Sequence, residues 1–356
     1  MRKILAIPFL LFLFLILSGC GINSNQIAKI PTFKLSPSVW KSIDGGADWE
    51  VKNKGEGKAN AESIDILSFA VNPFDGNNVF VGLRKGGILE TTDGGETWKF
   101  ISNYNSIKVY GLAFSPIDGK TLYAAGVWQN KGKIFKTNDD GENWTELYTS
   151  PSVGPIIISL MIDPKNSNVL YATTDTKEAI KSMDGGMTWK NIYLADDPIL
   201  KFVIDAADSN LIYFLDNSGK VFRSKDGGSN FEDISKNINK EKFSFSRGEF
   251  NVIRTDPTNS GHLYLAGADG IMLSKDKGKT WKEILALNNP EDFPIRALAI
   301  NPKNSNEMVY AMDQATYKSI DGGKTWKTFQ FDNKMKANVL EYNSAKEGEL
   351  YVGFTK

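Results

Sequence analysis

Residues 91–98 read TTDGGETW, and six other stretches of the chain repeat this pattern. The seven copies are Ser42–Trp49, Thr91–Trp98, Thr137–Trp144, Ser182–Trp189, Ser224–Phe231, Ser274–Trp281 and Ser319–Trp326. Their central aspartates, 42 to 50 residues apart, are Asp44, Asp93, Asp139, Asp184, Asp226, Asp276 and Asp321. A repeat of this length is typical of one four-stranded blade of a β-propeller.

The repeated stretch has the composition of a hairpin turn, because it lies between two short β-prone runs. The side chain of Asp93 can accept hydrogen bonds from backbone N–H groups a few residues further on. Gly95 permits a positive φ without steric cost. Trp98 is large and apolar with one donor, which suits it to pack beneath the hairpin. The pattern therefore predicts a role in the fold for these aspartates, not in catalysis.

Apolar hairpins alternate with these turns and supply the other two strands, A and B, of each blade. Their turns include Asn72-Pro73, Asp163-Pro164, Asp256-Pro257 and Asn301-Pro302, and related copies begin near Val109, Leu200 and Val339. The chain opens on a C–D pair around 39–51 and closes on an A–B pair around 339–354, so one blade needs both ends. We predict an all-β fold over residues 36–356, a single seven-bladed propeller closed by pairing of the two ends. An open solenoid would instead show capping repeats.

The repeat resembles the Asp-box, or BNR repeat, S/T-x-D-x-G-x-T/N-W. Two copies depart from it: Asp48 replaces Thr or Asn in the first, and Phe231 replaces Trp in the fifth. We expect these two turns to be looser.

Asp-box propellers occur in sialidases, xyloglucanase-type glycoside hydrolases, the ten-bladed sortilin domain and the photosystem II stability/assembly factor. The chain lacks the early Arg-Ile-Pro segment and the Arg triad of sialidases, and it lacks the Cys-rich modules of sortilin. Xyloglucanases pair two seven-bladed propellers around a cleft. A single ring is most similar to the assembly-factor type, whose members bind partner proteins, although the Arg-rich patch of that family is not evident.

Composition excludes several kinds of site. The formal net charge is zero, so the basic excess of a nucleic-acid-binding protein is absent. Cys20 is the one cysteine and His262 the one histidine, so no disulfide can form within the chain. The same counts argue against a His-based catalytic triad and a zinc site built on His and Cys. We therefore expect no cofactor and no metal.

The N-terminus has the features of an export signal. Arg2 and Lys3 precede an apolar stretch, 4–17, that is too short to span a bilayer comfortably. Residues 17–20 read LSGC, which resembles the bacterial lipobox, whose Cys is diacylated and becomes the new N-terminus. The resemblance implies a signal peptide over 1–19, a lipidated Cys20 and a flexible tether over 20–35. It places the protein on the outer face of a bacterial membrane.

Candidate binding residues lie on the D–A and B–C loops, at the end of the ring opposite the Asp-boxes. The longest D–A loop, 233–249, carries Phe243, Phe245, Arg247 and Glu249, a composition typical of recognition surfaces. Alternatively, this loop folds over its own blade. Trp128 lies in an expected extended B–C loop, 127–133, where it either binds a ligand or packs locally.

Two arginines and several carboxylates complete the candidate set. Arg254 and Arg296 lie on or near innermost strands, where they either line the channel or pair with a carboxylate such as Glu341. Carboxylates expected near the same mouth are Asp65, Asp175, Asp216, Asp269, Glu291, Asp292 and Asp313. Two of them could form a glycosidase pair.

The leading hypothesis is a monomeric, membrane-anchored binding or assembly module for a protein or glycan partner. The alternative is a cell-surface glycoside hydrolase, xyloglucanase-like or sialidase-like.

Overall fold

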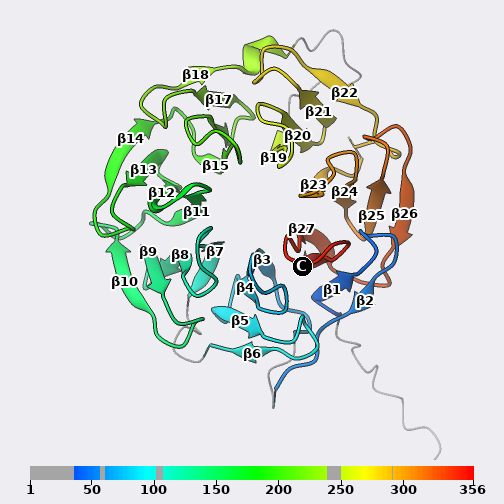
Figure 1. Cartoon of the computed structure of the whole chain (residues 1–356), viewed down its shortest axis with the longest axis horizontal. Coiled ribbons are helices and arrows are strands. Elements are labelled where there is room, and N and C mark those ends of the chain that lie inside the picture. Colours follow the sequence, from blue (N-terminus) through cyan, green and yellow to red (C-terminus); the bar gives the residue numbers. More distant parts are fainter. Residues whose placement is uncertain (1–35, 57–60, 102–106, 239–249, 291) are drawn as a thin grey trace, which may run out of the picture. The chain divides into compact units, whose positions relative to one another are not determined.

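The computed structural model describes residues 36–56, 61–101, 107–238, 250–290 and 292–356, and the compact unit spans Leu35–Lys356. In these residues seven four-stranded antiparallel sheets form a ring, with one strand of each sheet innermost (Figure 1). This confirms the predicted seven-bladed propeller. The described residues include a short 3-10 turn, Ser235–Asn237, and no helix long and apolar enough to cross a membrane.

Six of the seven sheets are each formed by four consecutive strands, and we call them uninterrupted. The strands of the first three, from the channel outward, are as follows. They are β3 (Ile66–Val71), β4 (Val79–Leu83), β5 (Ile88–Thr91), β6 (Lys99–Phe100); β7 (Lys108–Phe114), β8 (Leu122–Trp128), β9 (Lys131–Thr137), β10 (Thr145–Thr149); and β11 (Ile157–Asp163), β12 (Asn166–Thr174), β13 (Glu178–Ser182), β14 (Lys190–Leu194).

Three further sheets follow with the same strand order. They are β15 (Ile199–Ile204), β16 (Ile212–Asp216), β17 (Val221–Ser224), β18 (Glu232–Asp233); β19 (Phe250–Thr255), β20 (Leu263–Gly267), β21 (Gly270–Ser274), β22 (Lys282–Ile284); and β23 (Ile295–Ile300), β24 (Met308–Met312), β25 (Ala315–Ser319), β26 (Lys327–Gln330).

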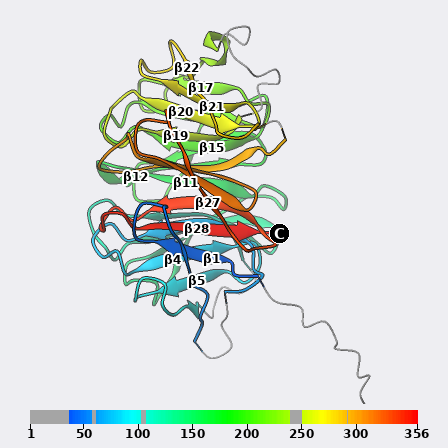
Figure 2. The same ribbon diagram turned by 90° about the vertical axis from the view of Figure 1, so that its right-hand side faces the viewer.

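The seventh sheet joins the two ends of the propeller. Its order is β2 (Glu50–Val51), β1 (Val39–Ser42), β28 (Leu350–Thr355) and β27 (Lys336–Tyr342). Strand β1 pairs antiparallel with β28 from Val39 opposite Gly353 to Ser42 opposite Leu350. Figure 2 shows β28 directly beside β1. The predicted closure is therefore confirmed, and it explains how a ring without a disulfide is sealed.

The second strand of each blade is buried on both faces, because neighbouring blades cover both sides of it. Tyrosines on three of these strands also reach the next blade. The hydroxyls of Tyr123, Tyr171 and Tyr351 donate to the carbonyls of Gly185, Gly227 and Gly94, at 3.1 to 3.2 Å. Each acceptor glycine belongs to an Asp-box of the following blade. These hydrogen bonds tie successive blades together near the Asp-box end.

The Asp-box turns have one hydrogen-bond pattern. In the second copy the hydroxyl of Thr91 donates to Asp93 Oδ1 at 2.7 Å and accepts from the Gly95 N–H at 3.0 Å. The hydroxyl of Thr97 donates to Asp93 Oδ2 at 2.6 Å. The first two bonds occur in all seven copies. The aspartates therefore hold the turns together.

Only one of the two divergent copies departs from this pattern. In the first, Asp48 donates its backbone N–H to Asp44 but has no side-chain donor to add. In the fifth, Asn230 supplies the side-chain donor to Asp226 at 2.8 Å, so the bonds to the aspartate are kept. The change to Phe231 removes the indole donor that other copies use, and its ring lies 5.1 Å from that of Phe214.

Acid is expected to weaken the Asp-boxes. Hydrogen bonds from the side chain and backbone of Thr188 and from Ser182 lower the pKa of Asp184 to about 2. A carboxyl whose pKa is lower in the folded state stabilises the fold fully above about pH 4, and this is lost as the pH falls toward 2. Thr188→Val should raise the pKa of Asp184 toward 3.8 and leave that of Asp226, also about 2, unchanged. An NMR titration of the carboxyl carbons measures both, and an unmoved Asp184 would contradict the assignment.

Candidate binding site at the central channel

The two ends of the ring differ in the turns they carry. The Asp-box of each blade donates a backbone hydrogen bond to a residue at or beside the A–B turn of the same blade, as Gly94 does to Asn77 and Gly227 to Asn210. In the closing blade the donor is Gly45 and the acceptor is Gly348. The Asp-boxes and A–B turns therefore share one end, here called the Asp-box end. The D–A and B–C connections lie at the other, here called the loop end.

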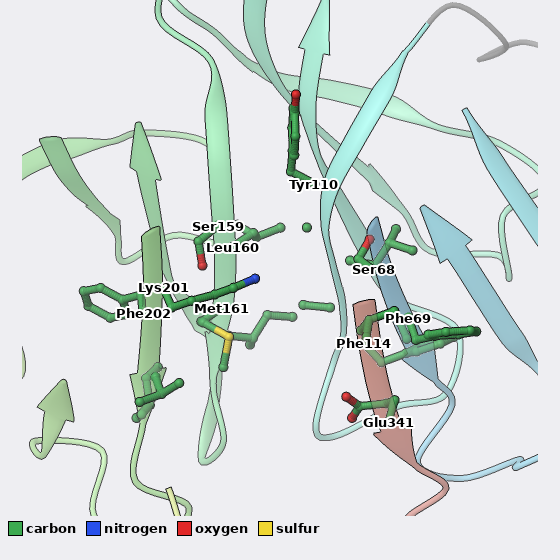
Figure 3. Close-up of a pocket in the computed structure, with 18 of the residues that line it drawn as sticks. Ser68, Phe69, Tyr110, Phe114, Ser159, Leu160, Met161, Lys201, Phe202 and Glu341 are labelled. Atoms are coloured by element: carbon green, nitrogen blue, oxygen red, sulfur yellow. The ribbon is translucent and has the colours of Figure 1, made fainter. Parts of the chain in front are cut away.

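A cavity of about 510 Å³ occupies the channel between the innermost strands (Figure 3). Its wall is mostly apolar, with Leu67, Phe114 and Met161 among the lining residues. A second cavity of about 230 Å³ lies among β19, β23 and β27 and their A–B turns. The two share Arg254 and Glu341, so they are adjoining parts of one channel.

Each innermost strand contains a β-bulge near its first residue, toward the loop end. The extra residues are Leu67, Tyr110, Ile158, Leu200, Asn251, Arg296 and Asn338. None of the seven is buried. We call this set the bulge rim. It is apolar over four consecutive blades and polar over the other three, so it has an amphipathic character.

Three charged side chains line the channel nearer its middle: Lys201 on β15, Arg254 on β19 and Glu341 on β27. Figure 3 shows Lys201 and Glu341 projecting into the cavity from different sides. Confinement within the ring raises the pKa of Glu341 to about 7, against the attraction of Arg254. Confinement, with a smaller effect of the Arg254 charge, lowers the pKa of Lys201 to about 8. The charges of Glu341 and Lys201 therefore respond to pH near neutrality.

Arg254 and Arg296, the two arginines predicted from the sequence, lie in different surroundings. Arg254 lines the channel and interacts electrostatically with Glu341. Arg296 belongs to the bulge rim, with its Nε 3.8 Å from Asp313 Oδ1. Lys336 Nζ lies 3.2 Å from the same oxygen. Two cations, Arg296 and Lys336, thus share one carboxylate at the loop end.

Trp128 does not lie in an extended loop, contrary to the prediction. The strands continue to Trp128 and from Lys131, and the turn is formed by Gln129 and Asn130 with φ of 51° and 60°. Two successive residues with left-handed backbone conformation form a tight hairpin turn. The pairing of the two strands therefore continues up to the turn. The ring of Trp128 packs 6.1 Å from that of Phe135 on its own blade.

The carboxylates considered for a glycosidase pair do not line either cavity, where Glu341 is the one acidic residue among those described. Asp65 lies 3.2 Å from Arg84, and Asp175 accepts the N–H of Ile156 at 2.8 Å. Asp216 caps its own turn by accepting from Ser218 and Lys220. Asp269 is buried, and Asp292 accepts from Asn289 at 3.1 Å. These groups thus serve local structure.

Several predicted residues lie outside the described part of the chain: Cys20, Phe243, Phe245, Arg247, Glu249 and Glu291. Within the described residues, no group of three or more His, Cys, Asp or Glu side chains could hold a metal ion.

Two features at this site were missed in the sequence. Lys201 is one lysine among many in the sequence, and only the ring places it in the same channel as Arg254 and Glu341. The connection from β22 to β23 carries three exposed apolar residues, Leu285, Leu287 and Phe293. The apolar residues of the stretch LALNNP, together with Phe293, lie between two strands. They were the signal that could have identified this connection.

Comparison with known proteins places this chain among Asp-box propellers. The model of the family "Sortilin, neurotensin receptor 3" (Sortilin-Vps10) matches residues 132–262 and 269–354, more than half of the chain. The chain belongs to the Sortilin-Vps10 family. A second model, the photosynthesis system II assembly factor YCF48, matches residues 35–159 of this Sortilin-Vps10 family member.

Curated relatives of this Sortilin-Vps10 protein are of two kinds. An oligoxyloglucan-reducing end-specific xyloglucanase of Emericella nidulans is 25% identical over 73% of this chain and 30% of its own length. A photosystem II assembly lipoprotein Ycf48 of Synechococcus is 24% identical over 42% of this chain and 51% of its own length. The chain thus spans less than a third of that xyloglucanase and about half of that lipoprotein.

Solved structures show the same fold. YCF48 bound to a D1 peptide superposes with a TM-score of 0.62 at 17% identity, over 83% of this chain and 94% of that one. A xyloglucanase from Xanthomonas campestris superposes with a TM-score of 0.68 at 16% identity, over 88% of this chain and 52% of that one. At these identities the likeness concerns the architecture of this Sortilin-Vps10 protein and not its activity.

Proposed function

We propose that this protein is a membrane-anchored, extracytoplasmic binding module that presents the loop end of its propeller to a protein partner. The observation that carries the proposal is the connection between β22 and β23. Leu285, Leu287 and Phe293 are 69%, 55% and 51% exposed there. Large apolar side chains grouped on one exposed segment are typical of protein-binding surfaces, because their transfer out of water drives association.

This connection is held in place by the next blade. The N–H of Leu287 donates to the Tyr310 hydroxyl at 3.0 Å, and the Trp326 indole donates to the Leu285 carbonyl at 2.8 Å. The amide of Asn288 also contacts the Tyr317 hydroxyl. A segment fixed in this way loses little conformational entropy when a partner binds. The exposed apolar groups are therefore preorganised for binding.

The bulge rim adjoins this connection, since Phe293 precedes β23 and Arg296 lies on it. Apolar anchors beside the two cations Arg296 and Lys336 would suit a protein segment that carries both apolar and acidic residues. The relative solved with a bound D1 peptide supports a protein partner over a glycan. A glycan partner remains an outcome that the experiment below distinguishes.

Photo-cross-linking tests which end of the propeller meets the partner. Benzoylphenylalanine is placed at Phe293, at the loop end, or at Phe74, a 60% exposed phenylalanine in an A–B turn at the Asp-box end. We expect irradiation of cells to yield a protease-sensitive adduct from position 293 and none from position 74. Equal adducts from both positions, adducts from position 74 alone, or no adduct at all would contradict the proposal.

The membrane anchor is tested at Cys20. Cys20→Ala should abolish incorporation of labelled fatty acid and move the protein from the membrane to the soluble fraction, because two or more acyl chains supply the binding energy of a lipoprotein anchor. Ser18→Thr, which changes a neighbouring residue and keeps the cysteine, is the control and should remain membrane-bound. Fatty-acid labelling that persists in Cys20→Ala would refute lipidation at this residue.

A glycoside hydrolase is the second candidate, favoured by the xyloglucanase relatives. Glycoside hydrolysis generally uses two carboxyl groups about 5–10 Å apart across the scissile bond. The described residues place one carboxylate, Glu341, in the channel cavities. We therefore expect no release of reducing sugar from xyloglucan oligosaccharides. Turnover that is lost in Glu341→Gln would instead establish the hydrolase.

A further inference from the structure

We propose that the central channel binds a small organic anion whose acidic group lies between Lys201 and Arg254. This site is separate from the loop-end surface proposed above. Among the described residues that line the two cavities, Lys201, Arg254 and Glu341 are the only charged side chains. Two cations therefore face one carboxylate inside the ring. The channel lining thus carries a net positive charge, and protein surrounds this space.

The two cations lack the partners that would make them structural. In the described part of the chain the Lys201 ammonium forms no hydrogen bond or ion pair, and its side chain is exposed to the channel. Arg254 Nη1 donates to the carbonyl of Ile253, its own neighbour, at 3.1 Å. No contact within 4.0 Å joins Arg254 to Glu341, so their attraction acts across a gap. The donors of both cations are thus available to a ligand.

An anion between these cations would relieve their mutual repulsion. Like charges in a confined space oppose one another, and confinement further disfavours the charged form of each side chain. Both effects act on Lys201 here, since Arg254 is the neighbouring cation. An acidic group with two or more oxygens can accept charge-assisted hydrogen bonds from the ammonium and the guanidinium together. Sulfonate, phosphate and carboxylate groups share this chemistry.

The size and wall of the cavity indicate that the ligand has an apolar body. A volume of about 510 Å³ lies in the range of small-molecule sites and greatly exceeds what an inorganic oxyanion fills. Phe114, Met161 and Val203 present apolar surface to the same space as the two cations. An acidic head with an apolar portion therefore fits better than a free inorganic ion or a sugar alone.

Glu341 competes with the anion, which gives the site a pH dependence. The channel-lining residues of the surrounding innermost strands carry no other charged group besides Lys201 and Arg254. Below about pH 7 Glu341 becomes neutral and stops repelling an anion, and above about pH 8 Lys201 loses its charge. Affinity for an anion that does not itself titrate should therefore rise as the pH falls from 9 to 6.

Calorimetry on the purified full-length protein in neutral detergent tests the site. The probes are naphthalene-1-sulfonate, its uncharged analogue naphthalene-1-sulfonamide, and inorganic sulfate. We expect the sulfonate to bind at least about tenfold more tightly than either comparison compound. Equal binding of the sulfonamide would overturn the ionic contact. Equal binding of inorganic sulfate would overturn the organic class of ligand.

Four variants assign the contacts. Lys201→Met and Arg254→Met should each weaken sulfonate binding at least about tenfold, whereas Glu341→Gln should strengthen it and flatten its pH dependence. Lys282→Gln, which removes a cation from the exposed outer strand β22, is the matched control and should bind as wild type. Unchanged affinity in both methionine variants, or weaker binding in Glu341→Gln, overturns the proposal. The gain expected for Glu341→Gln keeps the test decisive if a methionine variant fails to fold.

Discussion

Deleting residues 336–356 should abolish cooperative unfolding. The deletion removes β27 and β28 and leaves β1 and β2 as an isolated pair, which is marginal in water. It also removes Leu340, Val352 and Phe354, whose side chains are fully buried against the neighbouring blades. Thermal scanning with circular dichroism measures the result. A truncated chain that kept a single sharp transition near that of the full propeller would contradict the role assigned to the closing blade.

Two circular permutants separate the effect of closure from the loss of residues. In both, Lys356 is joined to Ser36 by a short glycine linker, which is feasible because the Phe354 N–H donates to the Ser38 carbonyl at 3.0 Å. One permutant opens between Gln129 and Asn130, so a blade is again shared by both ends. The other opens between Asp196 and Asp197, which leaves seven uninterrupted blades. The second should open and unfold more easily, because its ring opens by separating two blades, whereas opening the first must also break the strand pairing within the shared blade. Equal urea midpoints would argue against the closure mechanism.

Trp98→Ala should destabilise the propeller by about 4 kcal/mol, as expected when a large, fully buried aromatic is removed and leaves a cavity. Trp98 has 0% exposure. Residues 52–56 of the closing blade cover it: its indole N–H donates to the Lys52 carbonyl, and its backbone N–H to that of Lys54, both at 2.9 Å. The residue therefore belongs to the contact between the closing blade and the first uninterrupted one.

Trp144→Ala is the matched control, because Trp144 has the same place in its Asp-box. It is only half-buried, and its indole donates to Gly141 within its own turn. We expect a loss of about 1–2 kcal/mol there. Urea denaturation followed by circular dichroism measures both variants. Equal losses would show that the segment covering Trp98 adds nothing to stability.

The functional residues were harder to predict than the fold, for a physical reason. Arg254 was expected either to line the channel or to pair with a carboxylate such as Glu341, and it lines the channel with Glu341 as an electrostatic partner. Lys201 was not predicted there, because it comes from a strand far from both in sequence. The β-bulge that exposes Tyr110 and the equivalent residues of the other blades could not be predicted, because no sequence pattern marks an extra residue within an apolar run. Trp128 was misplaced because a Gln-Asn pair rarely signals the tight turn that both residues form with positive φ.

The architecture of this protein could be predicted from its repeats and their order. Seven Asp-boxes at blade-length spacing, such as Ser182–Trp189, are turns whose central hydrogen bonds join residues two to four apart. The order of the two ends, C–D first and A–B last, then required a shared blade. The tertiary structure alone decided which charges meet in the channel and which apolar residues stay exposed. Those properties arise from contacts between blades, and residues such as Lys201 and Glu341 come to line one channel only when the ring closes.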